Sequence, residues 1–163
     1  MRFAIAAVTV LLSAPAIAGP PLWQNVSAGM SVDVLRSLYP PVKGKVHHKG
    51  DRTIIEDVQQ IARCHPKVIV YHPGGIVSKV EIHSQMRGFP KETCGDAAAT
   101  ALIGKYGTPT ATDEARTPNL LVPQRDTFQT WIKDGVSIEF NRYNPETDDD
   151  WTIVYAPVKN IGL

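Results

Sequence analysis

Two histidines of this chain, His65 and His83, have a spacing that could bring two imidazole rings together. Between them lies Pro73-Gly74-Gly75 with β-rich sequence on either side, which predicts a hairpin with this tripeptide as its turn. The two histidines would then lie almost opposite each other on adjacent strands, about 5 Å apart at Cβ. Such a pair can share a metal ion, although a third ligand would have to come from His47, His48 or a carboxylate. We favour surface histidines on an exposed sheet face over a metal site, and we expect no cofactor.

The two cysteines, Cys64 and Cys94, are predicted to form a disulfide, because an isolated pair in an exported chain usually does so. Their spacing is far from the Cys-x-x-Cys of redox and zinc motifs. Closing a loop of about 30 residues would stabilise the fold by roughly 3–4 kcal/mol in the chain-entropy model. Cys64-His65 has the composition of a catalytic dyad, but neighbouring residues on a strand point to opposite faces and an oxidised cysteine is no nucleophile.

Carboxylates also occur in groups, but their patterns do not match catalytic or calcium-binding sites. Glu56-Asp57 are adjacent, so on a strand they would point to opposite faces. Glu146 and residues 148–150 form an acidic loop without the spacing of an EF-hand, which favours a solvated hairpin tip. The sequence also lacks a G-x-S-x-G nucleophile elbow, a glycine-rich phosphate loop and an H-E-x-x-H zinc motif. We therefore expect that this protein is not an enzyme.

Two short helices are expected among the elements that would position these residues. Ser31 is a suitable N-cap for a helix whose apolar stripe ends at Tyr39-Pro40. The second, alanine-rich helix runs from Cys94 to Tyr106 and is followed by Gly107-x-Pro109, a typical helix stop. Aligning Tyr39 with Tyr106 places similar apolar positions over each other, which suggests an internal duplication.

β-strands are predicted after each helix. Residues 67–71 and 76–84 flank the Pro-Gly-Gly turn, and residues 127–133 and 136–140 flank Asp134-Gly135. A further strand is expected at 151–155. Residues 53–62 have apolar spacing that also fits a helix, and we choose a strand because they parallel 127–133. The polar stretches 43–51 and 108–124, which are rich in turn formers, are expected to be connectors.

These elements predict an α+β fold of two tandem helix-plus-antiparallel-strand units. Each unit would contain one helix and three strands, with boundaries at about 29–90 and 91–157. The helices would pack on one face of an antiparallel sheet. Residues 19–163 would form a single domain, since they are enough for one hydrophobic core.

The Gly29-Met30-Ser31 helix start and the Tyr39-Pro40 helix end resemble those of small exported bacterial proteins. These include the SmpA/OmlA-type outer-membrane assembly lipoproteins and β-lactamase-inhibitor-protein-like domains. The half of the chain that contains Cys64, Cys94 and the Lys-Tyr-Gly-x-Pro sequence also resembles uncharacterised exported proteobacterial proteins. The resemblance implies helices on one face of an antiparallel sheet, and in the inhibitor a tandem repeat.

Residues 1–18 have the pattern of a secretory signal peptide. Arg2 precedes a short apolar run, and Ala16-x-Ala18 provides a cleavage site before Gly19. The run is shorter than the roughly 20 apolar residues that span a bilayer, and no cysteine at the cleavage site would take a lipid. We therefore expect a periplasmic or secreted protein that is neither membrane-spanning nor a lipoprotein.

Charge and motifs together lead to a functional hypothesis. Lysine and arginine number 17 against 16 acidic residues and are scattered along the chain, which argues against a nucleic-acid partner. We expect a non-enzymatic binding protein of the bacterial envelope whose partner is another protein or an envelope component. The alternatives are an inhibitor of a secreted hydrolase and a periplasmic metal-binding protein that uses surface histidines.

Overall fold

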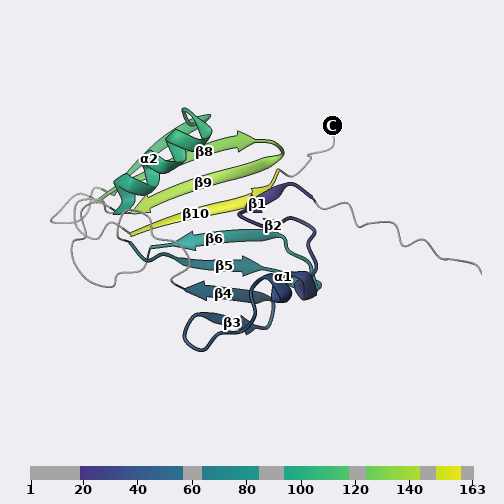
Figure 1. The fold of residues 1–163 in the computed structure, drawn as a ribbon. Helices are drawn as coiled ribbons and strands as arrows, with labels where there is room; N and C mark the ends of the chain where they lie inside the picture. Colours follow the sequence, from purple (N-terminus) through teal and green to yellow (C-terminus); the bar gives the residue numbers. More distant parts are fainter. Residues whose placement is uncertain (1–18, 57–63, 85–93, 118–123, 144–149, 159–163) are drawn as a thin grey trace, which may run out of the picture.

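The computed structural model describes residues 19–56, 64–84, 94–117, 124–143 and 150–158. Its main feature is one eight-stranded antiparallel sheet (Figure 1). In spatial order the strands are β3 (Val46–Lys49), β4 (Arg52–Glu56), β5 (Lys67–Tyr71), β6 (Lys79–His83), β10 (Asp150–Pro157), β9 (Val136–Tyr143), β8 (Gln124–Lys133) and β7 (Ala111–Thr117). The strands β6 and β10, which are far apart in the sequence, are thus the central pair of the sheet.

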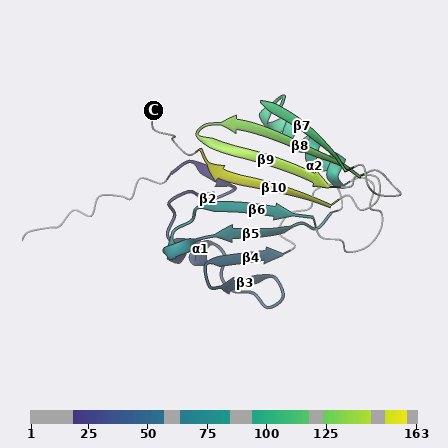
Figure 2. The same cartoon turned by 180° about the vertical axis from the view of Figure 1, so that it is seen from behind.

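The remaining elements are short. A two-stranded hairpin is formed by β1 (Pro21–Trp23) and β2 (Val26–Ser27), and a 3-10 turn η1 (Pro73–Gly75) joins β5 to β6. The helices are α1 (Val32–Leu38) and α2 (Cys94–Tyr106). Figure 1 shows both helices and the β1–β2 hairpin in front of the sheet, and in Figure 2, which is seen from behind, β8 and β9 lie in front of α2. One face of the sheet is therefore covered by these elements.

Alternation along the strands gives the two faces of the sheet different characters. The helix-bearing face includes Val80, Ile82, Phe140, Ile153 and Tyr155, all buried, which pack with Leu35 of α1 and Leu102 of α2 in one core. The opposite face, here called the open face, includes Lys79, Glu81 and His83 of β6 and Thr152 of β10. Because successive side chains of a strand point in opposite directions, each strand supplies both faces.

The predicted fold class is wrong. Two strands, β3 and β7, lie within the stretches 43–51 and 108–124 that were expected to be connectors. The pairing of Ile82 with Ile153 joins the strands into one continuous sheet, so the chain does not form two helix-plus-strand units. The structure is instead mostly β, with two α-helices in the described residues.

The missed strands have a common physical reason. Both β3 and β7 are at the edges of the sheet and pair with one neighbour each. Edge strands are often polar or charged, because an apolar edge would pair with other chains. The β7 sequence Ala-Thr-Asp-Glu-Ala-Arg-Thr has no alternating apolar residues, so its periodicity does not indicate a strand.

Several local predictions are confirmed. Ser31 is the N-cap of α1, with its hydroxyl accepting from the Val34 amide at 3.4 Å. Helix α2 begins and ends at the predicted residues, Cys94 and Tyr106. Strand β4 covers the first part of the ambiguous 53–62 segment, while residues 57–62 lie outside the described residues.

Candidate functional site

A polar cluster lies at the centre of the open face, on the middle strands of the sheet. Strand β6 contributes Lys79, Glu81 and His83 at alternate positions. Register places Tyr71 of β5 opposite Lys79, and Thr152 of β10 opposite His83. We call these five residues, Tyr71, Lys79, Glu81, His83 and Thr152, the Glu81 cluster.

The Glu81 carboxylate is the centre of this cluster. Its Oε1 accepts from Lys79 Nζ at 2.6 Å, and its Oε2 accepts from the Tyr71 hydroxyl at 2.9 Å. His83 Nε2 lies 2.9 Å from Oε2, and beside an ionised carboxylate this nitrogen carries the proton. The Glu81 side chain is 14% exposed. Three donors therefore fix one carboxylate at a partly buried position of a face that the helices do not cover.

The pKa of Glu81 reflects two opposing effects. Burial raises the pKa of the carboxyl, but the hydrogen bonds from Lys79, His83 and Tyr71 lower it more, so that its net value lies below the usual range. Burial and the neighbouring Glu81 carboxylate both raise the pKa of the Tyr71 hydroxyl. At neutral pH the carboxylate is therefore ionised and the tyrosine is a proton donor.

Two further contacts extend the cluster. Lys79 Nζ lies 4.4 Å from the centroid of the Tyr71 ring, a cation–π distance. His83 Nδ1 lies 3.3 Å from Thr152 Oγ1, so that hydroxyl, imidazole and carboxylate follow one another in a row. A row of this kind can activate a nucleophile, but the Thr152 contact is long for a hydrogen bond. Glu81 also accepts from two other donors, so the arrangement is better suited to holding charges in fixed positions.

Apolar side chains flank the Glu81 carboxylate on both neighbouring strands. Ile69 of β5 and Val154 of β10 are its cross-strand partners. Ile69 is 7% exposed, and Val154 is half-buried. The centre of the open face thus combines one fixed charged group with an apolar border.

The predicted histidine pair is not formed as expected. The register places Lys67 opposite His83, so His65 is not the cross-strand partner of His83. Both ring nitrogens of His83 are close to partners within the Glu81 cluster. His47 and His48 lie on the edge strand β3 and alternate between the two faces. Within the described part of the chain, no group of three or more His, Cys, Asp or Glu side chains could hold a metal ion.

The predicted acidic residues are dispersed. Glu56 ends β4, and Asp57 lies outside the described residues. Asp150 begins β10 and accepts a hydrogen bond from the Ser84 hydroxyl. Glu146, Asp148 and Asp149 also lie outside the described residues.

The disulfide between Cys64 and Cys94 is confirmed, with a Cα–Cα distance of 5.9 Å. It links the start of α2 to the segment that leads into β5. No helix of the described residues is both long and apolar enough to cross a membrane.

A second polar cluster, which sequence reasoning missed, lies on the helix-bearing face. The hydroxyl of Thr53 is 2.9 Å from His48 Nδ1 and 3.1 Å from His72 Nε2. Thr53 and His72 are buried, at 0% and 2% exposure. Burial and the Arg36 charge lower the pKa of His48, and they outweigh a hydrogen bond with the Tyr39 backbone, which raises it; the neighbouring His72 adds the smallest lowering effect. The signal for this cluster was a threonine at an inward position of β4, which needs a partner when buried.

Comparison of the chain with protein-family models, with curated proteins and with solved structures gives no match. The similarity to inhibitor-like and SmpA/OmlA-like domains therefore stays a prediction. The functional argument depends on the geometry of the open face and of the helix-bearing face alone.

Proposed function

We propose that this protein is an exported, non-enzymatic binding protein of the bacterial envelope that binds another protein through the open face of its sheet. The observation that supports this best is the Glu81 cluster on β5, β6 and β10. It places a carboxylate with three donors at the centre of a face that α1 and α2 leave uncovered (Figure 2). The disulfide agrees with an oxidising compartment.

The cluster supports binding because its side chains are already ordered. Lysine, glutamate and tyrosine side chains lose rotamer freedom when they enter an interface, at a cost of about 0.5–1.5 kcal/mol each. The mutual hydrogen bonds of Lys79, Glu81 and Tyr71 have met this cost before a partner arrives. Tyrosine is also enriched at the centres of protein interfaces.

The non-enzymatic part of the proposal is supported by the same geometry. The contact between Thr152 and His83 is 3.3 Å, and the Glu81 carboxylate that would orient the imidazole is shared with Lys79 and Tyr71. In a catalytic triad the carboxylate holds one histidine in the tautomer that catalysis requires. The Glu81 carboxylate instead accepts hydrogen bonds from Lys79 and Tyr71 as well. Absence of hydrolysis in a broad panel of ester, peptide and glycoside substrates is therefore expected.

The test is affinity capture from envelope extract with the mature chain and two matched variants. Thr152→Arg introduces a long charged side chain on the open face, and Thr100→Arg makes the same change on the exposed surface of α2. We expect one dominant stoichiometric partner that is captured by the wild type and by Thr100→Arg and is lost with Thr152→Arg. Capture that is equal for both variants, or no captured partner, would contradict the proposal.

The identity of the partner separates the more specific hypotheses. A secreted hydrolase would support the inhibitor alternative, and the purified pair would then show loss of hydrolase activity upon mixing. A structural component of the envelope would support an assembly role.

Thermal melting of each variant confirms that the replacement has not unfolded the chain.

A further inference from the structure

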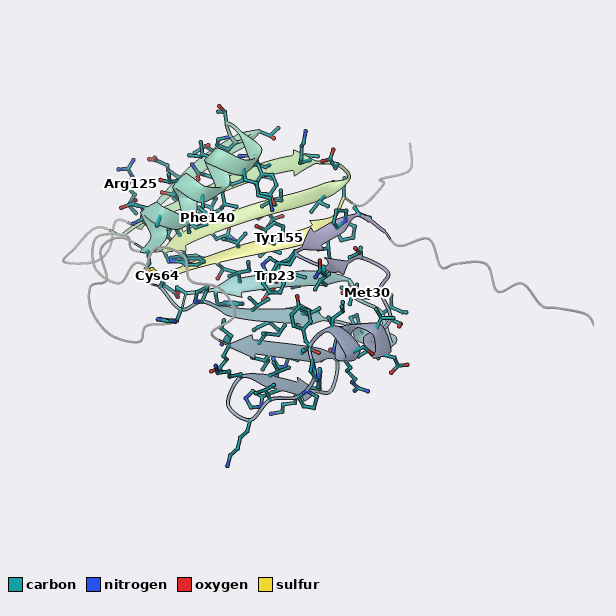
Figure 3. All side chains as sticks on the ribbon, in the orientation of Figure 1. Trp23, Met30, Cys64, Arg125, Phe140 and Tyr155 are labelled. Atoms are coloured by element: carbon teal, nitrogen blue, oxygen red, sulfur yellow. A yellow bond between two sulfur atoms is a disulfide. The ribbon has the colours of Figure 1, made fainter. Side chains whose placement is uncertain are left out.

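A groove lies on the helix-bearing face between α2 and the β1 strand, and we call it the α2–β1 groove. It consists of two cavities of about 260 and 250 Å³ that share Trp23, Gln24, Lys105 and Tyr155. Ligand sites usually measure about 300–1,000 Å³, so the two cavities together are in this range. Figure 3 shows Trp23 and Tyr155 near each other on this side of the sheet.

The floor of the groove is apolar and comes from the central strands. Ile82 of β6 and Ile153 of β10 lie under one cavity, and Ile138 of β9 lies under the other. Leu102 of α2 adds to the same surface. These side chains are almost fully buried, so an apolar ligand body would displace water from the small part of the floor that stays exposed, at about 25 cal/mol per Å² of buried area.

Helix α2 forms one wall and is fixed at both ends. At its start the Cys64–Cys94 disulfide and the ion pair between Arg142 and Asp96, at 2.6 Å, hold it to the sheet. At its end the indole of Trp131 donates to the carbonyl of Gly107 at 2.8 Å. Because both ends are tethered, the helix cannot easily move inward to close the groove.

The middle of α2 presents small side chains to the groove. Ala98 and Ala101 line one cavity, and both lie between the tethered ends. Larger residues at these positions would fill the space that the two alanines leave. The groove is thus a consequence of residue size along a fixed helix, and it exists before any ligand binds.

The opposite wall is also held in place. The turn between β1 and β2 includes Gln24, whose φ of 45° is unusual for a residue with a β-carbon. The Gln24 side chain accepts from the Tyr39 hydroxyl at 3.3 Å, and Trp23 stacks on the Tyr39 ring at 6.1 Å between centroids. Strained backbone of this kind is often found at functional positions.

The rim of the groove carries more positive than negative side chains. Lys105 lines both cavities, with its Nζ 5.0 Å from the centroid of the Tyr106 ring. Lys133 and Asp134 line the first cavity. Among the described residues that line the second cavity, Lys105 is the one charged side chain. Burial and the neighbouring Tyr106 raise the pKa of Tyr155, so that its hydroxyl stays neutral beside the lysine.

We propose that the α2–β1 groove binds a small amphipathic monocarboxylate of the acyl type. Its hydrocarbon chain lies over Ile82 and Ile153, and its carboxylate pairs with Lys105. A lysine beside an apolar floor fits a ligand with one negative charge and a long apolar body. This site is on the face opposite the Glu81 cluster, so the inference is independent of the proposed protein partner.

The experiment is calorimetric titration of the mature protein with dodecanoate, with dodecanol and dodecyltrimethylammonium as the neutral and cationic counterparts. We expect saturable 1:1 binding of dodecanoate and binding at least about tenfold weaker for both counterparts. A factor of about ten in affinity is what the loss of one charge-assisted hydrogen bond to Lys105 would cause. Amide chemical shifts of Ala98, Ala101 and Lys105 should change upon titration, while those of β3 should not.

Matched variants locate the site. Ala101→Phe fills the groove and should remove saturable binding, while Thr100→Phe, the neighbouring exposed position on α2, should bind as the wild type does. Lys105→Gln should weaken dodecanoate binding by about tenfold and leave dodecanol binding unchanged, and Lys43→Gln at an exposed remote position should change neither.

No saturable binding of dodecanoate, equal affinity for dodecanol, or undiminished binding by Ala101→Phe would each overturn the proposal. A vesicle measurement separates a free acyl anion from a lipid surface. Sedimentation with phosphatidylglycerol vesicles without binding of free dodecanoate would also refute it. Binding of dodecanoate without sedimentation with those vesicles supports the free anion as the ligand.

Discussion

Ile82 of β6 and Ile153 of β10 are direct cross-strand partners, although 71 positions separate them in the printed sequence. Both are buried on the helix-bearing face. This pair joins the strands of the first half of the chain to those of the second half. The two halves contribute to one core, so their stabilities should be coupled.

Ile153→Ala tests that coupling. Removing a buried isoleucine side chain from a packed core costs about 2–5 kcal/mol, so the free energy of unfolding should fall by this amount. Unfolding should remain a single transition, with coincident curves by tryptophan fluorescence and far-ultraviolet circular dichroism during urea titration. Two separate transitions would show that the halves of the sheet fold independently. Val154→Ala, at the adjacent half-buried position on the open face, is the control and should cost less.

Replacement of both cysteines by serine tests the disulfide. The Cys64–Cys94 bond closes a loop with a sequence separation of 30. Its loss should lower the free energy of unfolding by about 3–4 kcal/mol, because the unfolded chain regains conformational freedom. Dithiothreitol should destabilise the wild type by a similar amount and leave the double variant unchanged. A double variant as stable as the oxidised wild type would exclude a structural role for this bond.

The sequence predicts elements whose signals are local, and it fails where long-range pairing decides. The Ser31 cap and the Cys94–Tyr106 helix depend on residues within a few positions of each other, and both predictions are confirmed. The polar edge strands β3 and β7 exist because a neighbouring strand accepts their hydrogen bonds. Nothing in their own apolar pattern indicates this pairing, so the sequence alone predicts connectors at these positions.

The candidate site shows the same limit. Alternation in residues 76–84 correctly predicts a strand that contains Glu81 and His83. The partners Tyr71 and Thr152 follow from register, and Thr152 also from the pairing of β6 with β10. A difference of two residues in the hairpin register was enough to place His65, instead of Lys67, opposite His83. Register therefore determines which side chains form the cluster.

Acid should weaken the contribution of Glu81 to stability. The pKa of its carboxyl in the folded protein lies below the 4.5 of an unperturbed glutamate, because the hydrogen bonds that it accepts outweigh the effect of burial. A group with a lowered folded-state pKa stabilises fully above its unfolded-state pKa, and this stabilisation is lost as the pH falls through the folded-state value. The wild type should therefore exceed Glu81→Gln in free energy of unfolding at pH 6, and the difference should shrink below about pH 4.5.

Urea titrations of wild type and Glu81→Gln between pH 6 and pH 3 measure this difference. Glu139→Gln, at an exposed position of β9, controls for the loss of one negative charge. A difference that stays constant down to pH 3, or that grows as the pH falls, would contradict the role given to the hydrogen bonds of Glu81.

Thr53→Val tests the buried polar cluster beneath α1. Valine keeps the shape of threonine but cannot bridge His48 Nδ1 and His72 Nε2, which lie 2.9 and 3.1 Å from the hydroxyl. Leaving the buried His72 nitrogen without this partner should lower the free energy of unfolding by about 1–3 kcal/mol. Thr53→Ser keeps the hydroxyl and loses only a methyl group, so it should cost less than the valine replacement. If valine proves as stable as threonine in urea titration while serine is destabilised, packing rather than hydrogen bonding determines the identity of this position.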